Sequence, residues 1–203
     1  MRLALLALCG LLVPTQVLPA QQPAQNNPAP KPHKVLTPEQ MAFQQQYRQY
    51  DEERRKLLAQ GKQAYEAEIA RERAGDKAGE CKDAGSQYDW NMCLGRDAAI
   101  TETNYTAFAT AIRAILALKA PVWPGEGTNT AGVTGQSPTS EEDVKEFDTL
   151  ESLWRKYLNS ATSAAYKQFD GGTGAPSFEM QCSRDLMRSH MHELHLIYGD
   201  LWM

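Results

Sequence analysis

In this 203-residue chain, the cysteines and histidines are the candidates for disulfide formation, metal binding or catalysis. Cys81 and Cys93 lie twelve positions apart in the stretch ECKDAGSQYDWNMC, whereas Cys182 stands far along the chain. The twelve-residue spacing matches neither the CxxC motif of thiol redox proteins nor the ligand spacing of zinc fingers. It therefore favours a structural disulfide between Cys81 and Cys93, with a redox or metal-binding pair as the alternative.

Three histidines, His190, His192 and His195, fall together in the run HMHELH. Successive residues of a helix are rotated by about 100°, so His192 and His195 lie roughly 60° apart and His190 about 140° or more from either. The three rings therefore do not converge on one ion. His190 lies four residues after Leu186 and four before Leu194, on an apolar stripe, which predicts a half-buried, hydrogen-bonded histidine.

Two chemical alternatives remain for these side chains. One is a metal site formed by His192 and His195, with Glu193 as a possible further ligand. The other is a Cys182 nucleophile, which would need an activating base. His190 lies eight residues along the same helix, roughly 12 Å away, and is too distant for direct contact. The chain has no GxSxG motif and no Gly-rich phosphate loop after a strand, so we predict no enzyme, no cofactor and no metal.

The first twenty residues, MRLALLALCGLLVPTQVLPA, have the layout of a secretory signal peptide, with a short apolar run and a small residue at Ala20. Leu8 is too large to precede a lipidated cysteine, so a lipid anchor at Cys9 is not expected. We expect Cys9 to be removed with the signal. An exported protein, periplasmic or secreted, meets an oxidising environment in which disulfides form. Three cysteines remain after cleavage, and the odd number implies a free thiol or an intermolecular bond.

The segment after the signal divides into a linker and a long helix. Residues 21–36, QQPAQNNPAPKPHKVL, predict a disordered linker because they have little apolar surface to bury. Thr37-Pro38-Glu39-Gln40 predicts a helix start with a capping box. Within segment 37–79, the helix is predicted to run to about Ala74. Between Pro38 and Ala74 it has seven acidic and seven basic residues. We expect a mostly solvated helix, with a short coiled coil as the alternative.

Three amphipathic helices are predicted in residues 80–203, from apolar residues spaced by three and four. The first begins near Tyr88 and ends before Pro121, the second follows a Ser140 cap, and the last follows the GGTGAP turn. No strand pattern and no further apolar run long enough for a membrane span is found. The prediction is an all-α fold in which three helices form a compact group and the long charged helix leans on it or projects from it.

Several motifs follow one another in residues 80–196: WNMC, a helix carrying Asn104, LESLWRKYLNS, the GGTG turn and CSRDLMRSHMHEL. In this order they resemble the LprI-type lysozyme inhibitors, a family of small exported bacterial domains. Trp154 and Tyr157 match the W-x-x-Y-R pattern of that family. The resemblance implies an exported, non-catalytic protein that blocks the active-site cleft of a muramidase.

The chain differs from the family pattern at three positions. Leu158 stands where the family has arginine, Thr162 stands near the place of another cysteine, and His190 replaces an arginine eight residues after the last cysteine. If the last two cysteines of the family pair with each other, the loss of the first leaves Cys182 without a partner. On this resemblance we expect one free thiol, at Cys182.

Charge bears on the kind of partner. Residues 80–203 contain seventeen acidic and ten basic residues, a net charge near −7. This charge argues against a nucleic-acid partner. It suits a basic lysozyme, which an acidic surface would attract in a salt-dependent way, although an acidic surface that serves only solubility accounts for the same charge.

Two loops are candidates for contact with a lysozyme, whose cleft contains two catalytic carboxylates. One is the turn with Gly171, Gly172 and Thr173, and the other is the 121–140 loop with Trp123, an aromatic anchor. Simple connections without partner contacts are the alternative for both. The alternative function is an envelope structural or interaction module that uses the long charged helix and does not inhibit lysozyme.

Overall fold

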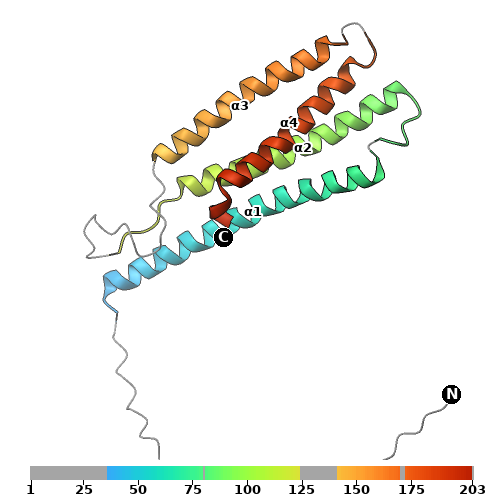
Figure 1. Cartoon of the computed structure of the whole chain (residues 1–203). Helices are drawn as coiled ribbons and strands as arrows, with labels where there is room; N and C mark the ends of the chain where they lie inside the picture. Colours follow the sequence, from blue (N-terminus) through green and yellow to red (C-terminus); the bar gives the residue numbers. More distant parts are fainter. Residues whose placement is uncertain (1–35, 80, 124–140, 170–171, 203) are drawn as a thin grey trace, which may run out of the picture. The chain divides into compact units, whose positions relative to one another are not determined.

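The computed structural model describes residues 36–79, 81–123, 141–169 and 172–202. They form four α-helices and a short 3-10 helix (Figure 1): α1 Pro38–Ala78, α2 Gln87–Ala117, α3 Glu141–Lys167, α4 Ala175–Ile197 and η1 Gly199–Trp202. No strand occurs in these ranges, so the predicted all-α fold is confirmed. Within the same ranges, no helix has the length and apolar character needed to cross a membrane. The predicted signal peptide and nearly all of the predicted linker lie outside them.

Local capping explains where the first two helices begin. The Thr37 hydroxyl accepts the Gln40 backbone N–H at 3.2 Å, and the Gln40 side chain accepts the Thr37 N–H at 3.1 Å, which confirms the capping box. Ser86 accepts the Asp89 N–H at 3.1 Å and caps α2. α1 extends past the predicted end to Ala78 and stops at Gly79, whose φ of 76° favours glycine.

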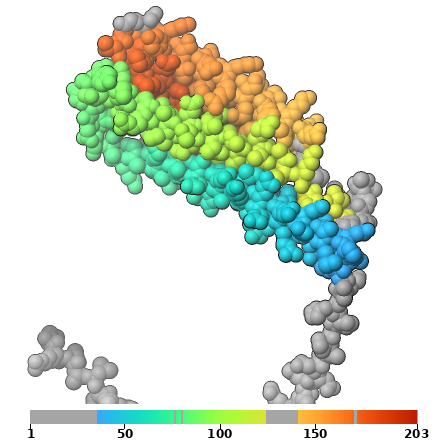
Figure 2. All heavy atoms as spheres, turned by 180° about the vertical axis from the view of Figure 1, so that it is seen from behind, coloured from blue at the N-terminus to red at the C-terminus, as the bar shows by residue number. Residues whose placement is uncertain are grey.

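Residues 36–203 form one compact unit. α1 packs along α2, α4 packs on α2, and α3 packs mainly on α4. α2 and α4 run in the same direction, and α1 and α3 run in the opposite one (Figure 1). The view from behind shows α1 and α2 side by side (Figure 2). The long charged helix therefore leans on the group mainly through α2.

The apolar core gathers around α2. Its buried side chains are Tyr105, Phe108, Ala109, Ile112 and Leu116 of α2, Phe147 and Leu158 of α3, Met187, Met191 and Leu194 of α4, and Ala64 of α1. α1 contributes one small residue, in agreement with its thin apolar stripe. α1 also packs closely at Gly61. A Cβ added there would clash with the Trp202 ring and lie 3.0 Å from the Ala111 Cβ.

Candidate binding surface

The predicted disulfide is confirmed: Cys81 and Cys93 are bonded, with their Cα atoms 5.9 Å apart. The bridge ties the segment between α1 and α2 to the second turn of α2. Cys81 has a φ of 49°, which is uncommon for a residue other than glycine. Closing a loop this short stabilises the fold by roughly 3 kcal/mol in the chain-entropy description.

Cys182 is a free, half-buried thiol in α4. Burial, followed by the negative charge of Asp185, raises the pKa of this thiol. A raised pKa lowers the fraction of thiolate, which is the nucleophilic form. Cys182 is therefore poorly suited to nucleophilic catalysis.

The turn between α3 and α4 carries an exposed aromatic pair. The rings of Phe169 and Phe178 stack with centroids 3.7 Å apart, and about two-fifths of each residue is exposed, 39% and 43%. The Gly172 N–H donates to the Phe169 carbonyl at 2.8 Å, and Thr173 is exposed. The predicted contact residues Gly172 and Thr173 thus belong to the short segment whose two flanking phenylalanines stack at the surface, while Gly171 is outside the described residues.

The first turns of α2 hold this turn in place. The Asn91 side-chain amide donates to the Thr173 carbonyl at 3.3 Å. Gln87 donates to the Ser177 hydroxyl at 2.8 Å and to the Asn91 side-chain oxygen at 2.9 Å. The Ser177 hydroxyl in turn donates to Asn91, and Ser177 is buried. The position of the turn is therefore set by polar side chains of another helix.

A polar hollow of about 380 Å³ lies beside the turn, lined by Asn159, Thr162, Ser163 and Tyr166 of α3 and Glu179 of α4. Within the described part of the chain, the Glu179 carboxylate has no hydrogen-bond or ion-pair partner. Aromatic rings beside an uncompensated acid are suited to a partner with basic side chains. We call Tyr166, Phe169, Thr173, Phe178 and Glu179 the turn surface.

Trp123, the other predicted contact residue, lies in a separate aromatic cluster. Its ring meets Phe43 edge-on with centroids 4.6 Å apart, and Tyr47 and Tyr50 continue the line of rings along α1. Trp123 follows the end of α2, whereas the turn surface lies beside the start of α2 (Figure 1). The two predicted contact loops therefore do not form one surface. Residues 124–140 of the first loop lie outside the described ranges.

The family-motif residues Trp154 and His190 pack against each other between α3 and α4. Their rings stack with centroids 4.2 Å apart and nearly parallel planes. The two ring nitrogens of His190 lie 2.9 Å from a Glu151 oxygen and 3.0 Å from a Glu193 oxygen. His190 is only 3% exposed, so it is hydrogen-bonded as predicted but more deeply buried. Tyr157, the third motif residue, is exposed.

Tyr105 extends this contact to α2. It is fully buried, and its hydroxyl donates to Glu151. Burial, followed by the hydrogen bond to this carboxylate, raises the pKa of Tyr105 far above its ordinary value. The phenol therefore stays protonated and serves as a hydrogen-bond donor between helices. A partner in solution cannot reach it.

His192 and His195 face α1. The His192 ring nitrogens lie 3.1 Å from the Tyr65 hydroxyl and 3.2 Å from a Glu72 oxygen, and the His195 ring stacks on Tyr65 with centroids 4.3 Å apart. Across the described ranges, no three His, Cys, Asp or Glu side chains are placed to hold a metal ion. The two histidines connect α4 to α1.

A buried ionic network, which the sequence analysis missed, joins α1, α2 and α4. Its centre is Glu68, 1% exposed, which accepts hydrogen bonds from Thr101 at 2.7 Å, Asn104 at 2.8 Å and Arg188 Nε at 2.8 Å. Burial alone would raise the pKa of Glu68, but these hydrogen bonds outweigh burial and hold the pKa below its ordinary value. The sequence contains one indication of this position: Gly61, Ala64 and Glu68 are spaced by three and four residues, which places Glu68 on the packed face of α1.

Further charges complete the network. Arg71 contacts Glu68 at 3.0 Å and also Asp97, whose carboxylate lies 3.2 Å from buried Arg184 and 3.4 Å from Arg188. Opposite charges therefore alternate across three helices, with Glu68 and both α4 arginines buried and with Arg71 and Asp97 partly exposed. We assign the network to packing between the helices.

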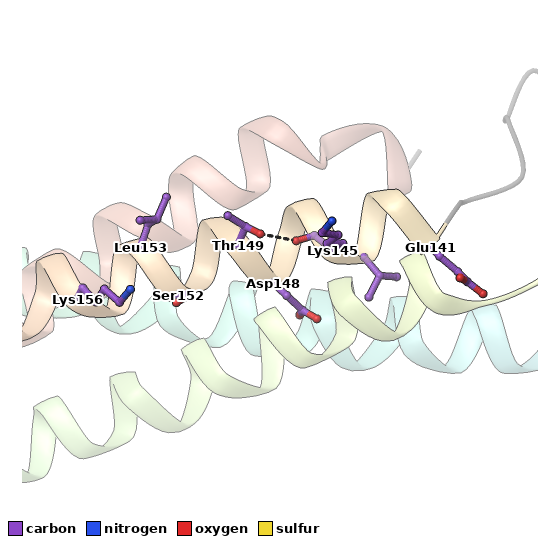
Figure 3. Close-up of a pocket in the computed structure, with 8 residues that line it drawn as sticks. Glu141, Lys145, Asp148, Thr149, Ser152, Leu153 and Lys156 are labelled. Atoms are coloured by element: carbon purple, nitrogen blue, oxygen red, sulfur yellow. Dashed lines mark hydrogen bonds between the residues drawn. The ribbon is translucent and has the colours of Figure 1, made fainter.

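Two other hollows lack the features of a site. A depression of about 440 Å³ is lined by residues of α3 alone, including Lys145, Asp148 and Thr149 (Figure 3). Without a wall from a second element, it cannot enclose a ligand. A groove of about 980 Å³ between α1 and α2 is lined mostly by Ala, Thr and Gln, and its one charged residue, Glu102, already pairs with Arg155.

Comparisons with family models, with curated proteins and with solved structures give no match. The resemblance to the LprI-type family therefore depends on the quoted motifs alone. In the residues that the structure describes, the class is defined by the fold: a four-helix, all-α protein with one short-loop disulfide and an aromatic surface at the α3–α4 turn.

Proposed function

We propose that this chain is an exported, non-catalytic binding protein that inhibits a lysozyme-type muramidase through the turn surface. The observation that carries the proposal is the exposed, stacked pair of Phe169 and Phe178, which flank Thr173 in the sequence. Large aromatic side chains are common hot spots of protein interfaces. A turn at the end of two helices is also narrow enough to enter a cleft.

The charge and the aromatic rings of the turn surface support a basic lysozyme as the partner. The turn surface combines aromatic rings with the carboxylate of Glu179, which has no ion-pair partner among the described residues, and residues 80–203 have a net charge near −7. Such a surface attracts a basic protein, and the attraction weakens as salt screens the charges. The exposed Thr173 would lie at the centre of the contact, where its hydroxyl can hydrogen-bond a carboxylate of the enzyme cleft.

A catalytic role is not proposed. His190 and Tyr105 both contact the Glu151 carboxylate, but both are buried. The raised pKa of Cys182 disfavours its thiolate. The side chains that remain exposed at the turn are suited to recognition.

The test is a lysis assay with the purified chain from Gln21 onward and a basic lysozyme, at low and high salt. We expect inhibition that weakens at high salt. The double variant Phe169→Ala, Phe178→Ala should weaken inhibition by roughly 30-fold, as the loss of a hot spot of about 2 kcal/mol would. No inhibition by the unaltered chain at a large molar excess would exclude the proposal.

A second candidate uses the aromatic cluster of Phe43, Tyr47, Tyr50 and Trp123. Four neighbouring rings at the start of α1 favour an envelope interaction module with a partner other than lysozyme. The double variant Phe43→Ala, Tyr47→Ala separates the two functions. It should leave lysozyme inhibition unchanged under the main proposal, and it should abolish envelope association under the second.

A further inference from the structure

The turn surface depends on a part of α2 that has little apolar packing of its own. In the first turn of α2, Gln87, Tyr88 and Asp89 are exposed, and Leu94 is the first fully buried side chain. Helix ends with few buried contacts open readily. Something other than the core must therefore keep this turn helical.

The disulfide supplies that restraint. Cys93 lies on the second turn of α2, two residues after Asn91, and its bond to Cys81 fixes a segment whose residues 82, 83, 85 and 86 are exposed. Two residues further on, an added Cβ at Gly95 would lie 3.0 Å from the Met180 sulfur, so α2 and α4 approach closely here. The bridge therefore ties the segment before α2 to the second turn of α2, at the place where α2 lies close to α4.

We propose that the Cys81–Cys93 bridge keeps Asn91 in position to hold the turn surface, so that reduction of the bridge turns off binding there. Asn91 is a positioning residue, because its amide donates to the Thr173 carbonyl and its oxygen accepts from Ser177. This inference rests on the proposed function, since it concerns the control of the same surface.

The reductant is a dithiol. One of its thiolates attacks a sulfur of the half-buried bridge, a mixed disulfide forms, and its second thiol displaces the protein sulfur. Two electrons pass to the protein, Cys81 and Cys93 each take up a proton as thiols, and the dithiol becomes a disulfide. The freed segment then no longer restrains the first turns of α2.

Hydrogen exchange tests the coupling without any binding partner. The chain carries Cys182→Ser, so that the bridge is its only redox group after signal removal, and is compared with and without dithiothreitol. We expect amide exchange in residues 172–178 and 87–95 to accelerate about tenfold on reduction, because local opening becomes easier. Exchange in residues 105–116 of the core should not change.

Two variants sharpen the test. Asn91→Ala keeps the bridge, and we expect faster exchange in residues 172–178 with unchanged exchange in residues 81–86. Gln181→Ala, an exposed amide on α4, is the matched control and should behave as the unaltered chain. The inference is overturned if reduction leaves exchange at 172–178 unchanged, if it accelerates the core equally, or if Asn91→Ala has no effect.

Lysis assays then separate this inference from the proposed function. Coupled exchange in a chain that never inhibits lysozyme would exclude the function and leave the control by the bridge intact. Equal inhibition by the oxidised and reduced chains would exclude the control and leave the function intact. We expect inhibition by the oxidised chain and at least a tenfold weaker effect after reduction.

Discussion

Glu68 is a carboxylate enclosed by three helices, and its substitution tests what the ionic network does. Glu68→Gln keeps the size of the side chain but removes a carboxylate charge 2.8 Å from buried Arg188, while Asp97 stays 3.4 Å away. We expect a loss of roughly 3 kcal/mol in the free energy of unfolding, measured with urea, because breaking a buried ion pair is costly. The control Glu66→Gln removes an exposed ion pair with Lys62 and should change stability by less than about 0.5 kcal/mol.

The same carboxylate makes stability depend on acidity. The pKa of Glu68 in the folded protein lies below the ordinary value of 4.5, so the folded state favours the ionised form. Its contribution is complete above pH 4.5 and is lost as the pH falls through the lowered folded pKa. Urea titrations between neutral and acidic pH should show a smaller acid-induced loss in Glu68→Gln than in the unaltered chain. Equal losses in both proteins would contradict this assignment.

The register of α3 against α4 determines which residue of α3 lies opposite the free thiol of Cys182. Glu151 meets His190 and Phe169 stacks on Phe178, so the antiparallel pairing places Thr162 opposite the turn of α4 that contains Cys182. We expect Thr162→Cys to form a disulfide with Cys182 during oxidative refolding, because facing positions on adjacent helices bring the sulfurs within reach. Thiol labelling and mass measurement should then find no free cysteine.

A neighbouring position provides the control for this bridge. Ser163→Cys places the new thiol one residue further, rotated by about 100° around the helix. We expect it to stay reduced and to label together with Cys182. Labelling of both thiols in Thr162→Cys would show that the register differs.

At the level of elements, Gly61 decides how closely α1 packs. Alanine has a higher helix propensity than glycine by about 1 kcal/mol, which would stabilise an isolated helix. Here an added Cβ meets the Trp202 ring and the Ala111 side chain, and overpacking costs roughly 1–3 kcal/mol. We therefore expect Gly61→Ala to lower the thermal midpoint, whereas Gly199→Ala, with open space around it, should not. A higher midpoint for Gly61→Ala would contradict the close packing.

Local signals in the sequence predicted the elements well. The Thr37 and Gln40 capping box and apolar residues at helical spacing act within a few residues, so they are visible in one chain. The packing of Glu68 was not predictable in the same way, because its partners on α2 and α4 lie 33 to 120 positions away. A long helix with many acidic and basic residues is predicted to be solvent-exposed as long as its ion pairs with other helices are unknown.

The candidate surface was predicted only in part. Gly172 and Thr173 stand out because glycine marks a turn. Phe178 fits the apolar periodicity of its helix, which predicts a packed position, yet it stacks on Phe169 at the surface. Periodicity identifies an apolar face but does not show whether another helix extends far enough to cover its end.

For the whole molecule, the compact unit of residues 36–203 indicates which N-terminal residues can be removed without loss of stability. We expect a chain that begins at Leu36 to keep its thermal midpoint, measured by circular dichroism, because the unit contains its own core and capping residues. A chain that begins after Gly79 should not fold cooperatively, because Arg184 and Arg188 would lose Glu68 and Arg71 from their network. A midpoint that falls by several degrees in the first truncation would contradict this boundary.

Trp202 covers Gly61 of α1, and Arg54 donates a hydrogen bond to the Leu201 carbonyl, 147 positions further along the chain. During translation, α1 therefore leaves the ribosome well before the residues that will shield its inner side. Closure of such a distant contact delays completion of the fold. A chain that is still being synthesised therefore cannot complete the packing of α1 until Leu201 and Trp202 have emerged.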